Sequence, residues 1–140
     1  MQTFLPYPDF AQSARCLDRQ RLGKQRVEVL QLLRALLVPG AGWGNHPAAK
    51  MWRTKELALL RYGEAICSEW IGRGYNDTCL CKMRDLYFAH RQGETNTMPD
   101  WLWNEAFHAA HRSNPLRKDP VHYSQFGWTE GPDLPYVWPV

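Results

Sequence analysis

The sequence predicts an all-α protein, a single compact domain of about three main helices with a long, aromatic, proline-rich C-terminal segment. Apolar residues recur at three- and four-residue spacings over two long stretches, residues 18–37 and 47–71. No stretch of useful length alternates apolar and polar residues as a strand would. With 140 residues, 44% of them hydrophobic, the chain can bury a core, and we expect one domain spanning residues 1–140.

The first helices are predicted from capping and stop signals. Pro6 and Pro8 favour an extended start, and Asp9 is suited to cap a first short helical turn. A long helix then runs from about Asp18 to Leu37, and Val38-Pro39-Gly40 ends it because proline disfavours helical backbone in the residue before it. The apolar side of this helix, which we expect to face the core, carries Leu22, Val29, Leu33 and Leu36.

A second helical stretch begins at Pro47, a residue suited to the first turn of a helix. Its apolar spacing continues to Ile71 with a break near Arg53-Thr54, and Gly72-Arg73-Gly74 ends it. A short helix is expected around Met83–His90. Residues 47–90 are thus predicted to form this interrupted helical stretch and one short helix.

A last helix is predicted from near Pro99-Asp100 to about Arg112. Its polar side is expected to carry Asn104, His108, His111 and Arg112. Beyond Pro115 we expect little regular structure, but enough aromatic area to strap the segment across the helices.

Neither a metal nor a cofactor is expected. Glu105, His108 and His111 are spaced by three residues, but successive steps of three drift around a helix and no further motif completes a coordination shell. Cys79 and Cys81 are separated by one residue, which fits neither zinc nor redox spacing, so the four cysteines are expected to be reduced thiols. With no signal peptide and no apolar run approaching ~18 residues, we expect a cytoplasmic protein without a membrane partner.

Glu28 is the most informative residue, because it is the only acid between Arg19 and Glu56. On a helix it shares a face with Arg21, Lys24 and Gln25. Two interpretations are open: a salt-bridge partner, or a carboxylate that does chemistry on a polyanion held by the surrounding cations. Arg19 and Arg26 project toward the apolar side, so either the helix is interrupted near Gly23 or these arginines snorkel around the core.

Other segments also suggest nucleic acid. The net charge of +3 is weak support, but basic residues concentrate at residues 15–26 and again at Arg112, Arg117 and Lys118. Asn45-His46-Pro47 is either a ligand clamp at a helix start or a turn with an N-cap. Seven Trp and six Tyr offer stacking platforms.

The order and spacing of these segments resemble the pyrimidine-dimer DNA glycosylases of the phage endonuclease V type over nearly the whole chain. The matching segments are Leu17-Asp18…Leu22…Glu28, Asn45-His46-Pro47, the stretch Trp70-Ile71-Gly72-Arg73-Gly74-Tyr75-Asn76, and the aromatic stretch from His111 through Leu116-Arg117-Lys118-Asp119-Pro120-Val121-His122-Tyr123 to Phe126-Gly127.

This resemblance implies a bifunctional DNA glycosylase and AP lyase in which an N-terminal α-amine attacks the sugar of the damaged nucleotide. By position, Glu28 takes the role of the family's catalytic glutamate and Met1 supplies the α-amine. Gln2 departs from the family's small second residue and is expected to leave Met1 in place. Lys24, one turn from Glu28, is the alternative amine; water is a third nucleophile, without lyase activity.

The expected partner is double-stranded DNA with a damaged or modified base, bound by a monomer associated with the nucleoid. The side chains expected to contact DNA are Arg19, Arg21, Gln25, Arg26, Asn45, His46, Arg112, Arg117, Lys118 and Tyr123. Two rival interpretations remain at this stage: a non-catalytic DNA- or RNA-binding module on the same scaffold, and a helical domain that binds a small molecule or a protein.

Overall fold

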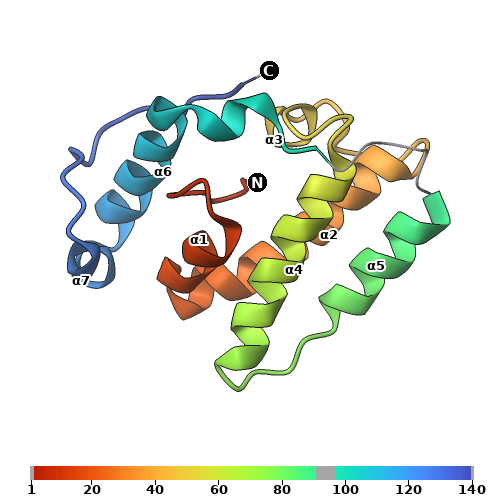
Figure 1. Cartoon of the computed structure of the whole chain (residues 1–140), viewed down its shortest axis with the longest axis horizontal. Coiled ribbons are helices and arrows are strands. Elements are labelled where there is room, and N and C mark those ends of the chain that lie inside the picture. The colour runs from red at the N-terminus through yellow and green to blue at the C-terminus, as the bar shows by residue number, and fades with distance from the viewer. Residues whose placement is uncertain (1, 91–96, 140) are drawn as a thin grey trace.

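The computed structural model describes residues 2–90 and 97–139, and helices are its only regular elements there (Figure 1). The all-α prediction is confirmed, but the chain is divided into more helices than the three predicted main ones. The helices of the described residues are α1 (Phe10–Cys16), α2 (Arg19–Leu37), α3 (Pro47–Lys50), α4 (Glu56–Gly72), α5 (Cys79–His90), α6 (Glu105–Lys118) and α7 (Pro120–Tyr123), with 3-10 turns η1 (Asp100–Trp103) and η2 (Ser124–Phe126).

The capping residues of the first two helices are the predicted ones. The Asp9 side chain accepts a hydrogen bond from the Gln12 backbone N–H at 2.8 Å, and Asp18 accepts one from the Arg21 backbone N–H at 3.3 Å. Helix α2 ends with Val38 as its C-cap, before Pro39-Gly40, and Gly40 has a φ of +79° that suits glycine. The long helix therefore has the predicted bounds.

Helices α2, α4 and α5 pack side by side as the centre of the molecule (Figure 1). Leu22, Val29 and Leu33 of α2 are fully buried there, and Leu36 is half-buried against the same core, as predicted. A Cβ atom on Gly63 of α4 would lie 2.9 Å from Cγ1 of Val29, so glycine permits α4 to approach α2 closely.

The second helical stretch is broken where predicted. Helix α3 ends at Lys50, α4 begins at Glu56, and Thr54 between them has a φ of +68°, which a helix does not allow. Helix α4 ends at Gly72, as predicted, and α5 is longer than expected because it already begins at Cys79.

The prediction for the last helix is wrong at both ends. Residues 100–103 form the 3-10 turn η1, and α6 begins only after Asn104, whose side chain caps it by accepting from the Ala106 N–H at 3.0 Å. Helix α6 then continues through Pro115 to Lys118, because one proline removes only one backbone bond from a helix whose face is otherwise buried. Residues 120–126 are also helical, so the predicted lack of regular structure holds only for residues 128–139.

The predicted polar side of α6 is also wrong for its histidines. His108 and His111 are 1% and 0% exposed and hold the N-terminal segment. Nδ1 of His111 accepts a hydrogen bond from the Leu5 N–H at 2.9 Å, and both ring nitrogens of His108 lie 2.6 Å from carbonyl oxygens, those of Leu5 and Leu102. Figure 1 shows the N-terminal segment between α6 and the α1–α2 pair. Among the described residues no cluster suited to a metal ion is present.

Helix α2 is continuous through Gly23, so the alternative of an interrupted helix is wrong. Arg19 is exposed, as snorkelling requires, whereas Arg26 is mostly buried in an ion pair. The Arg26 guanidinium lies 4.4 Å from the centre of the Trp70 ring and 2.5 Å from Oδ1 of Asp77, and Arg19 lies 5.3 Å from the Tyr75 ring.

All four cysteines are free thiols, and burial raises the pKa of Cys16 to about 12. In the part of the chain described, no helix combines the length and apolar character needed to cross a bilayer.

Candidate active site

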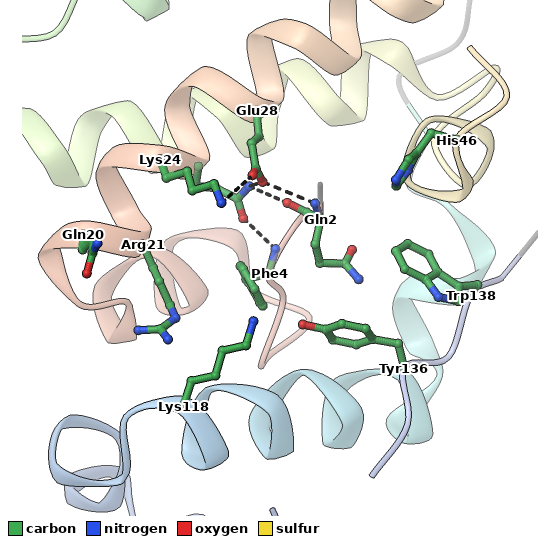
Figure 2. A pocket seen from close by; sticks show the side chains of 11 residues that line it. Gln2, Phe4, Gln20, Arg21, Lys24, Glu28, His46, Lys118, Tyr136 and Trp138 are labelled. Atoms are coloured by element: carbon green, nitrogen blue, oxygen red, sulfur yellow. Dashed lines mark hydrogen bonds and ion pairs between the residues drawn. The ribbon is translucent and has the colours of Figure 1, made fainter. Parts of the chain in front are cut away.

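A cavity of about 480 Å³ lies between α2 and the C-terminal part of the chain (Figure 2). One wall is α2, the opposite wall is Lys118 of α6 with residues 136 and 138, and the N-terminal segment lies between them. The lining residues are Gln2, Phe4, Gln20, Arg21, Lys24, Gln25, Glu28, His46, Lys118, Tyr136 and Trp138. Glu28 is the one carboxylate in this set, which also contains the basic residues Arg21, Lys24 and Lys118.

The Glu28 carboxylate is held in place rather than left on the outer surface. Its side chain is 12% exposed, and Oε2 accepts hydrogen bonds from the Gln2 backbone N–H and from Nε2 of Gln25, both at 3.3 Å. Oε1 lies 3.6 Å from Nζ of Lys24, whose side chain is 76% exposed. An ion pair with so exposed a cation is weak, so the carboxylate remains available to a group that enters the cavity.

Gln25 fixes the N-terminal segment against α2. Its Oε1 accepts from the Phe4 N–H at 2.7 Å, and its Nε2 donates to the Gln2 carbonyl oxygen at 2.6 Å. The Tyr62 hydroxyl of α4 donates to the Phe4 carbonyl oxygen at 2.6 Å. These bonds bring the backbone nitrogen of Gln2 to Glu28. Met1, predicted to supply an α-amine, lies outside the residues that the structure describes.

The cations of the cavity come from two helices far apart in sequence. Arg21 and Lys24 are on α2, and Lys118 is on the last turn of α6 (Figure 2). Arg21 also pairs with Asp18 at 3.0 Å. Burial would raise the pKa of Asp18, but hydrogen bonds from Tyr123 and Arg21 outweigh it and hold this pKa below its usual value. Asp18 therefore stays ionised and keeps Arg21 in position.

His46 lies at one end of the cavity and also caps α3, as the turn-with-N-cap alternative for Asn45-His46-Pro47 predicts. Nδ1 of His46 accepts a hydrogen bond from the Ala48 N–H at 3.0 Å. Burial lowers the pKa of His46 below its usual value, although the nearby Glu28 charge acts in the opposite direction. The neutral ring therefore carries its proton on Nε2. Asn45 is exposed and does not line the cavity.

Several side chains predicted to contact DNA lie elsewhere and bind the protein itself. Arg112 is paired with Glu105 and Glu130 and donates to the Pro6 carbonyl oxygen at 2.8 Å. Tyr123 is fully buried, stacks on Trp128 and hydrogen-bonds Asp18.

Two further basic residues lie on other parts of the surface. Arg26 is on the opposite side of α2, paired with Asp77, and Arg117 is exposed next to Lys118 without lining the cavity. Of the predicted residues, the structure brings together Arg21, Lys24, Gln25, Glu28, His46 and Lys118.

A second, more open hollow of about 620 Å³ lies on the neighbouring side of α2 and shares Gln20 and Lys24 with the first cavity. Arg19 and Trp70 line it. The exposed Lys24 therefore lies between the two hollows and lines both of them.

Sequence reasoning missed five lining residues: Gln2, Phe4, Gln20, Tyr136 and Trp138. Tyr136 and Trp138 belong to the aromatic segment that was expected only to pack on the helices, and Trp138 does contact the core. Burial raises the pKa of Tyr136 to about 12, so its hydroxyl keeps its proton. Gln2 was noted only as a departure at the family's second residue, and nothing in the sequence marks Phe4. The positions of both depend on bonds to residues more than twenty positions away.

The fold and this cavity define a class of small helical protein with one oriented carboxylate in a cation-lined cleft, an arrangement suited to a polyanionic substrate. The chain belongs to the pyrimidine dimer DNA glycosylase family, whose model matches residues 1–83, more than half of the 140 residues. Comparisons with curated proteins and with solved structures gave no match. The family match includes the α2 wall and Glu28, whereas Lys118, Tyr136 and Trp138 lie outside the matched residues.

Proposed function

We propose that this protein is a DNA glycosylase with AP-lyase activity that excises a damaged or modified pyrimidine from duplex DNA. The observation that carries this proposal is the Glu28 carboxylate, oriented by the Gln2 N–H and the Gln25 amide at the edge of a cavity lined by cations. We propose that residues 1–140 act as one domain and as a monomer on the DNA in the cytoplasm.

In the proposed reaction a neutral amine attacks C1′ of the damaged nucleotide, and the bond from C1′ to the base breaks. The base leaves with the electron pair of that bond and takes up a proton. The amine loses one proton and is then bound to C1′. The C1′–O4′ bond breaks, O4′ takes up a proton, and the opened sugar is held as a protonated imine. Removal of a proton from C2′ then breaks the C3′–O bond and expels the 3′ phosphate by β-elimination. Glu28 would stabilise positive charge on the sugar and transfer these protons.

The candidate nucleophiles are the α-amine at the start of the chain and the side-chain amine of Lys24. The α-amine of Met1 is one residue from the Gln2 nitrogen, which lies 3.3 Å from Glu28. An α-amine is partly neutral near physiological pH, as a nucleophile requires, whereas ordinary lysine amines are protonated. Nζ of Lys24, 3.6 Å from Glu28, is the alternative. If processing removes Met1, the nitrogen of Gln2 itself becomes the α-amine.

The cleft cations support DNA as the partner. Arg21 and Lys24 on α2 lie across the cavity from Lys118 on α6, and the three would hold phosphates on either side of the extruded nucleotide (Figure 2). We expect neutralisation of any one of them to weaken binding of all duplexes and to reduce the salt dependence of binding by about one phosphate contact.

The direct test is incubation with ultraviolet-irradiated and abasic duplexes in the presence of borohydride. The expected result is strand cleavage and a stable protein–DNA adduct, because borohydride reduces the imine. Peptide mapping of the adduct then identifies the amine as that of Met1, Gln2 or Lys24. Lack of both cleavage and adduct at low salt and high protein concentration contradicts the lyase mechanism.

A second function is a non-catalytic DNA-binding module. One observation favours it: Gln2 departs from the small second residue of the family, and its nitrogen donates to Glu28 as a backbone amide. This alternative predicts salt-sensitive DNA binding that is indifferent to Glu28→Gln and no base release from any duplex.

A further inference from the structure

Trp43 combines an exposed indole with a strained backbone. The residue is 61% exposed, and its φ of +74° lies in the left-handed region that bulky residues rarely adopt. Two hydrogen bonds hold the backbone there. The Trp43 carbonyl oxygen accepts from the His46 N–H at 3.0 Å, and the Gly44 carbonyl oxygen accepts from Nη2 of Arg53 at 2.5 Å. Strain of this kind, which no burial of the side chain compensates, is typical of residues that bind a ligand.

Most other tryptophans of the chain are used by the protein itself. Four of the seven donate the ring N–H to an acceptor of the chain: Trp52, Trp70, Trp101 and Trp128. The Trp43 indole has no such bond among the described residues, and its ring contact there is an edge-to-face one with His46, 5.9 Å between centres. A Cβ atom placed on the neighbouring Gly42 would meet nothing within 4 Å, so the space beside the ring is open.

The indole lies just outside the cavity that contains Glu28. His46 lines that cavity and contacts two tryptophan rings, Trp43 at 5.9 Å and Trp138 at 6.1 Å. Trp138 also lines the cavity, whereas Trp43 does not. Figure 2 shows His46 and Trp138 at the same end of the cavity. Trp43 is therefore one ring further out than His46, where a molecule that enters the cavity would continue onto the surface.

The segment around Trp43 has the charge of a surface that meets an anion. No Asp or Glu occurs from residue 29 to residue 55, whereas this stretch contains Arg34, Lys50, Arg53 and Lys55. Arg34 in the last turn of α2 and Lys50 in α3 are both exposed. Proteins that bind unpaired nucleotides combine cations for the phosphates with flat rings for the bases. This charge favours DNA over a protein as the partner of the exposed ring.

We infer that the Trp43 indole stacks on a base of the substrate DNA that leaves the helical stack next to the extruded nucleotide, and so holds the distorted duplex on the protein. The inference rests on the proposed function and adds a positioning residue outside the cavity. The strained backbone keeps the ring exposed before DNA binds, so little ordering is needed when the base stacks. Because every base has a flat face, this contact is independent of sequence.

A duplex that the protein cannot cleave tests this contact by binding alone. Its one lesion is a tetrahydrofuran abasic analogue, which has no oxygen at C1′ and cannot form an imine, and the same duplex without the lesion is the comparison. Trp43→Ala should lower affinity for the lesion duplex about tenfold, as for one lost base–aromatic stack. Affinity for the undamaged duplex should change less than about threefold, because its bases stay stacked.

The outcome that overturns the inference is equal affinity of Trp43→Ala and the wild type for the lesion duplex. That result would assign the exposed ring to a protein partner. Trp103→Ala is the matched control, because Trp103 is 71% exposed on η1 and far in sequence from the loop. It should bind both duplexes as the wild type does, and a loss as large as that of Trp43→Ala would also overturn the inference.

Two further readouts separate stacking from charge. Trp43→Phe keeps an aromatic face and should retain affinity for the lesion duplex within about threefold of the wild type. In Trp43→Ala the slope of log affinity against log salt concentration should be unchanged, because an indole neutralises no phosphate. In Lys118→Gln, which removes a phosphate contact, the slope should decrease by about one. Affinity of Trp43→Phe as low as that of Trp43→Ala would contradict stacking.

Trp43→Asn guards against a trivial loss of structure, because asparagine tolerates left-handed backbone. The variant should unfold at a higher urea concentration than Trp43→Ala and still bind the lesion duplex as weakly. Stability and binding would then change in opposite directions, which a structural role of the indole does not predict. Wild-type affinity in Trp43→Asn overturns the inference.

The two proposals can fail separately. A loss of lesion binding in Trp43→Ala, found together with no imine trapping on any duplex, supports the stacking contact and removes the lyase chemistry. Imine trapping by the wild type together with unchanged lesion binding in Trp43→Ala keeps the chemistry and removes the stacking contact. Failure of the wild type to bind either duplex removes both.

Discussion

The N-terminal segment is held from two sides by buried polar side chains, and the two sides differ in what they leave accessible. On the α6 side, His108 and His111 bind the backbone of Leu5 and are fully enclosed. On the α2 side, Gln25 and Glu28 bind the backbone of residues 2–4 at the edge of the cavity. The α6 side therefore anchors the segment, whereas the α2 side combines anchoring with an accessible carboxylate.

The largest effect is expected on the α2 side, from Glu28→Gln. The amide keeps an oxygen for the Gln2 N–H but cannot stabilise positive charge on the sugar or accept a proton. Base excision in single-turnover experiments should fall by about 10³-fold, while affinity for the duplex changes less than about threefold. The comparison variant Gln31→Glu changes the charge of α2 at an exposed position one turn further along. It therefore tests whether a change of charge on this helix is enough to alter excision. Excision by Glu28→Gln at the normal rate would show that our assignment of this residue is wrong.

Gln25→Leu should be the most destabilising change to the anchor itself. It leaves the Phe4 N–H and the Gln2 carbonyl oxygen without their partners in a buried place. We expect the free energy of unfolding to decrease by about 2–4 kcal/mol, and excision to fall because the segment no longer lies against α2. Urea denaturation monitored by tryptophan fluorescence measures the first effect. A stability equal to that of the wild type would mean that the α6 side holds the segment alone.

The α6 side should make stability depend on pH. Burial lowers the pKa of His111 to about 3, so the folded state binds fewer protons than the unfolded state, whose histidine has a pKa near 6.5. The stabilisation is complete above pH 6.5 and is lost as pH falls toward 3, by at most about 1.4 kcal/mol per pH unit.

Denaturation of the wild type and of His111→Gln between pH 7.5 and 4.5 isolates this contribution. Glutamine offers an acceptor to the Leu5 N–H but does not titrate, so the variant should lose about 2 kcal/mol less than the wild type across this range. Parallel pH profiles would contradict the prediction and assign the acid sensitivity to other groups.

The smallest effect is expected from Tyr62→Phe, which removes a hydroxyl shared between the Phe4 carbonyl oxygen and Oε1 of Gln25. The Tyr62 hydroxyl donates to the Phe4 carbonyl oxygen at 2.6 Å, in a fully buried place. Unfolding free energy should decrease by about 1 kcal/mol, and excision should stay within about threefold of the wild type because Gln25 still holds the segment. A loss of activity as large as that of Gln25→Leu would show that the two contacts act as one unit.

The sequence predicted well those features that depend on neighbours along the chain, and poorly those that depend on residues distant in the sequence. Asp9, Asp18 and Pro47 act within one helical turn, and their helices begin where predicted. Pro115 was expected to lie at the end of regular structure, yet α6 continues past it because burial of the helix outweighs one lost hydrogen bond.

The same reasoning explains the errors in the candidate site. His108 and His111 were expected on a polar face, since periodicity does not distinguish an exposed histidine from one satisfied by a distant backbone. Arg26 and Arg112 were predicted to contact DNA, and the structure pairs them with carboxylates that the sequence does not place beside them: Asp77, Glu105 and Glu130.

By itself the sequence determined that this chain is helical, where its first long helix begins and ends, and that Glu28 stands alone among cations, because these properties depend on neighbours along one helix. Only the tertiary structure decided which side chains meet at the cavity. Gln2, Glu28, Lys118 and Trp138 are brought together by hydrogen bonds and burial between segments up to 136 residues apart, and local spacing contains no record of such contacts.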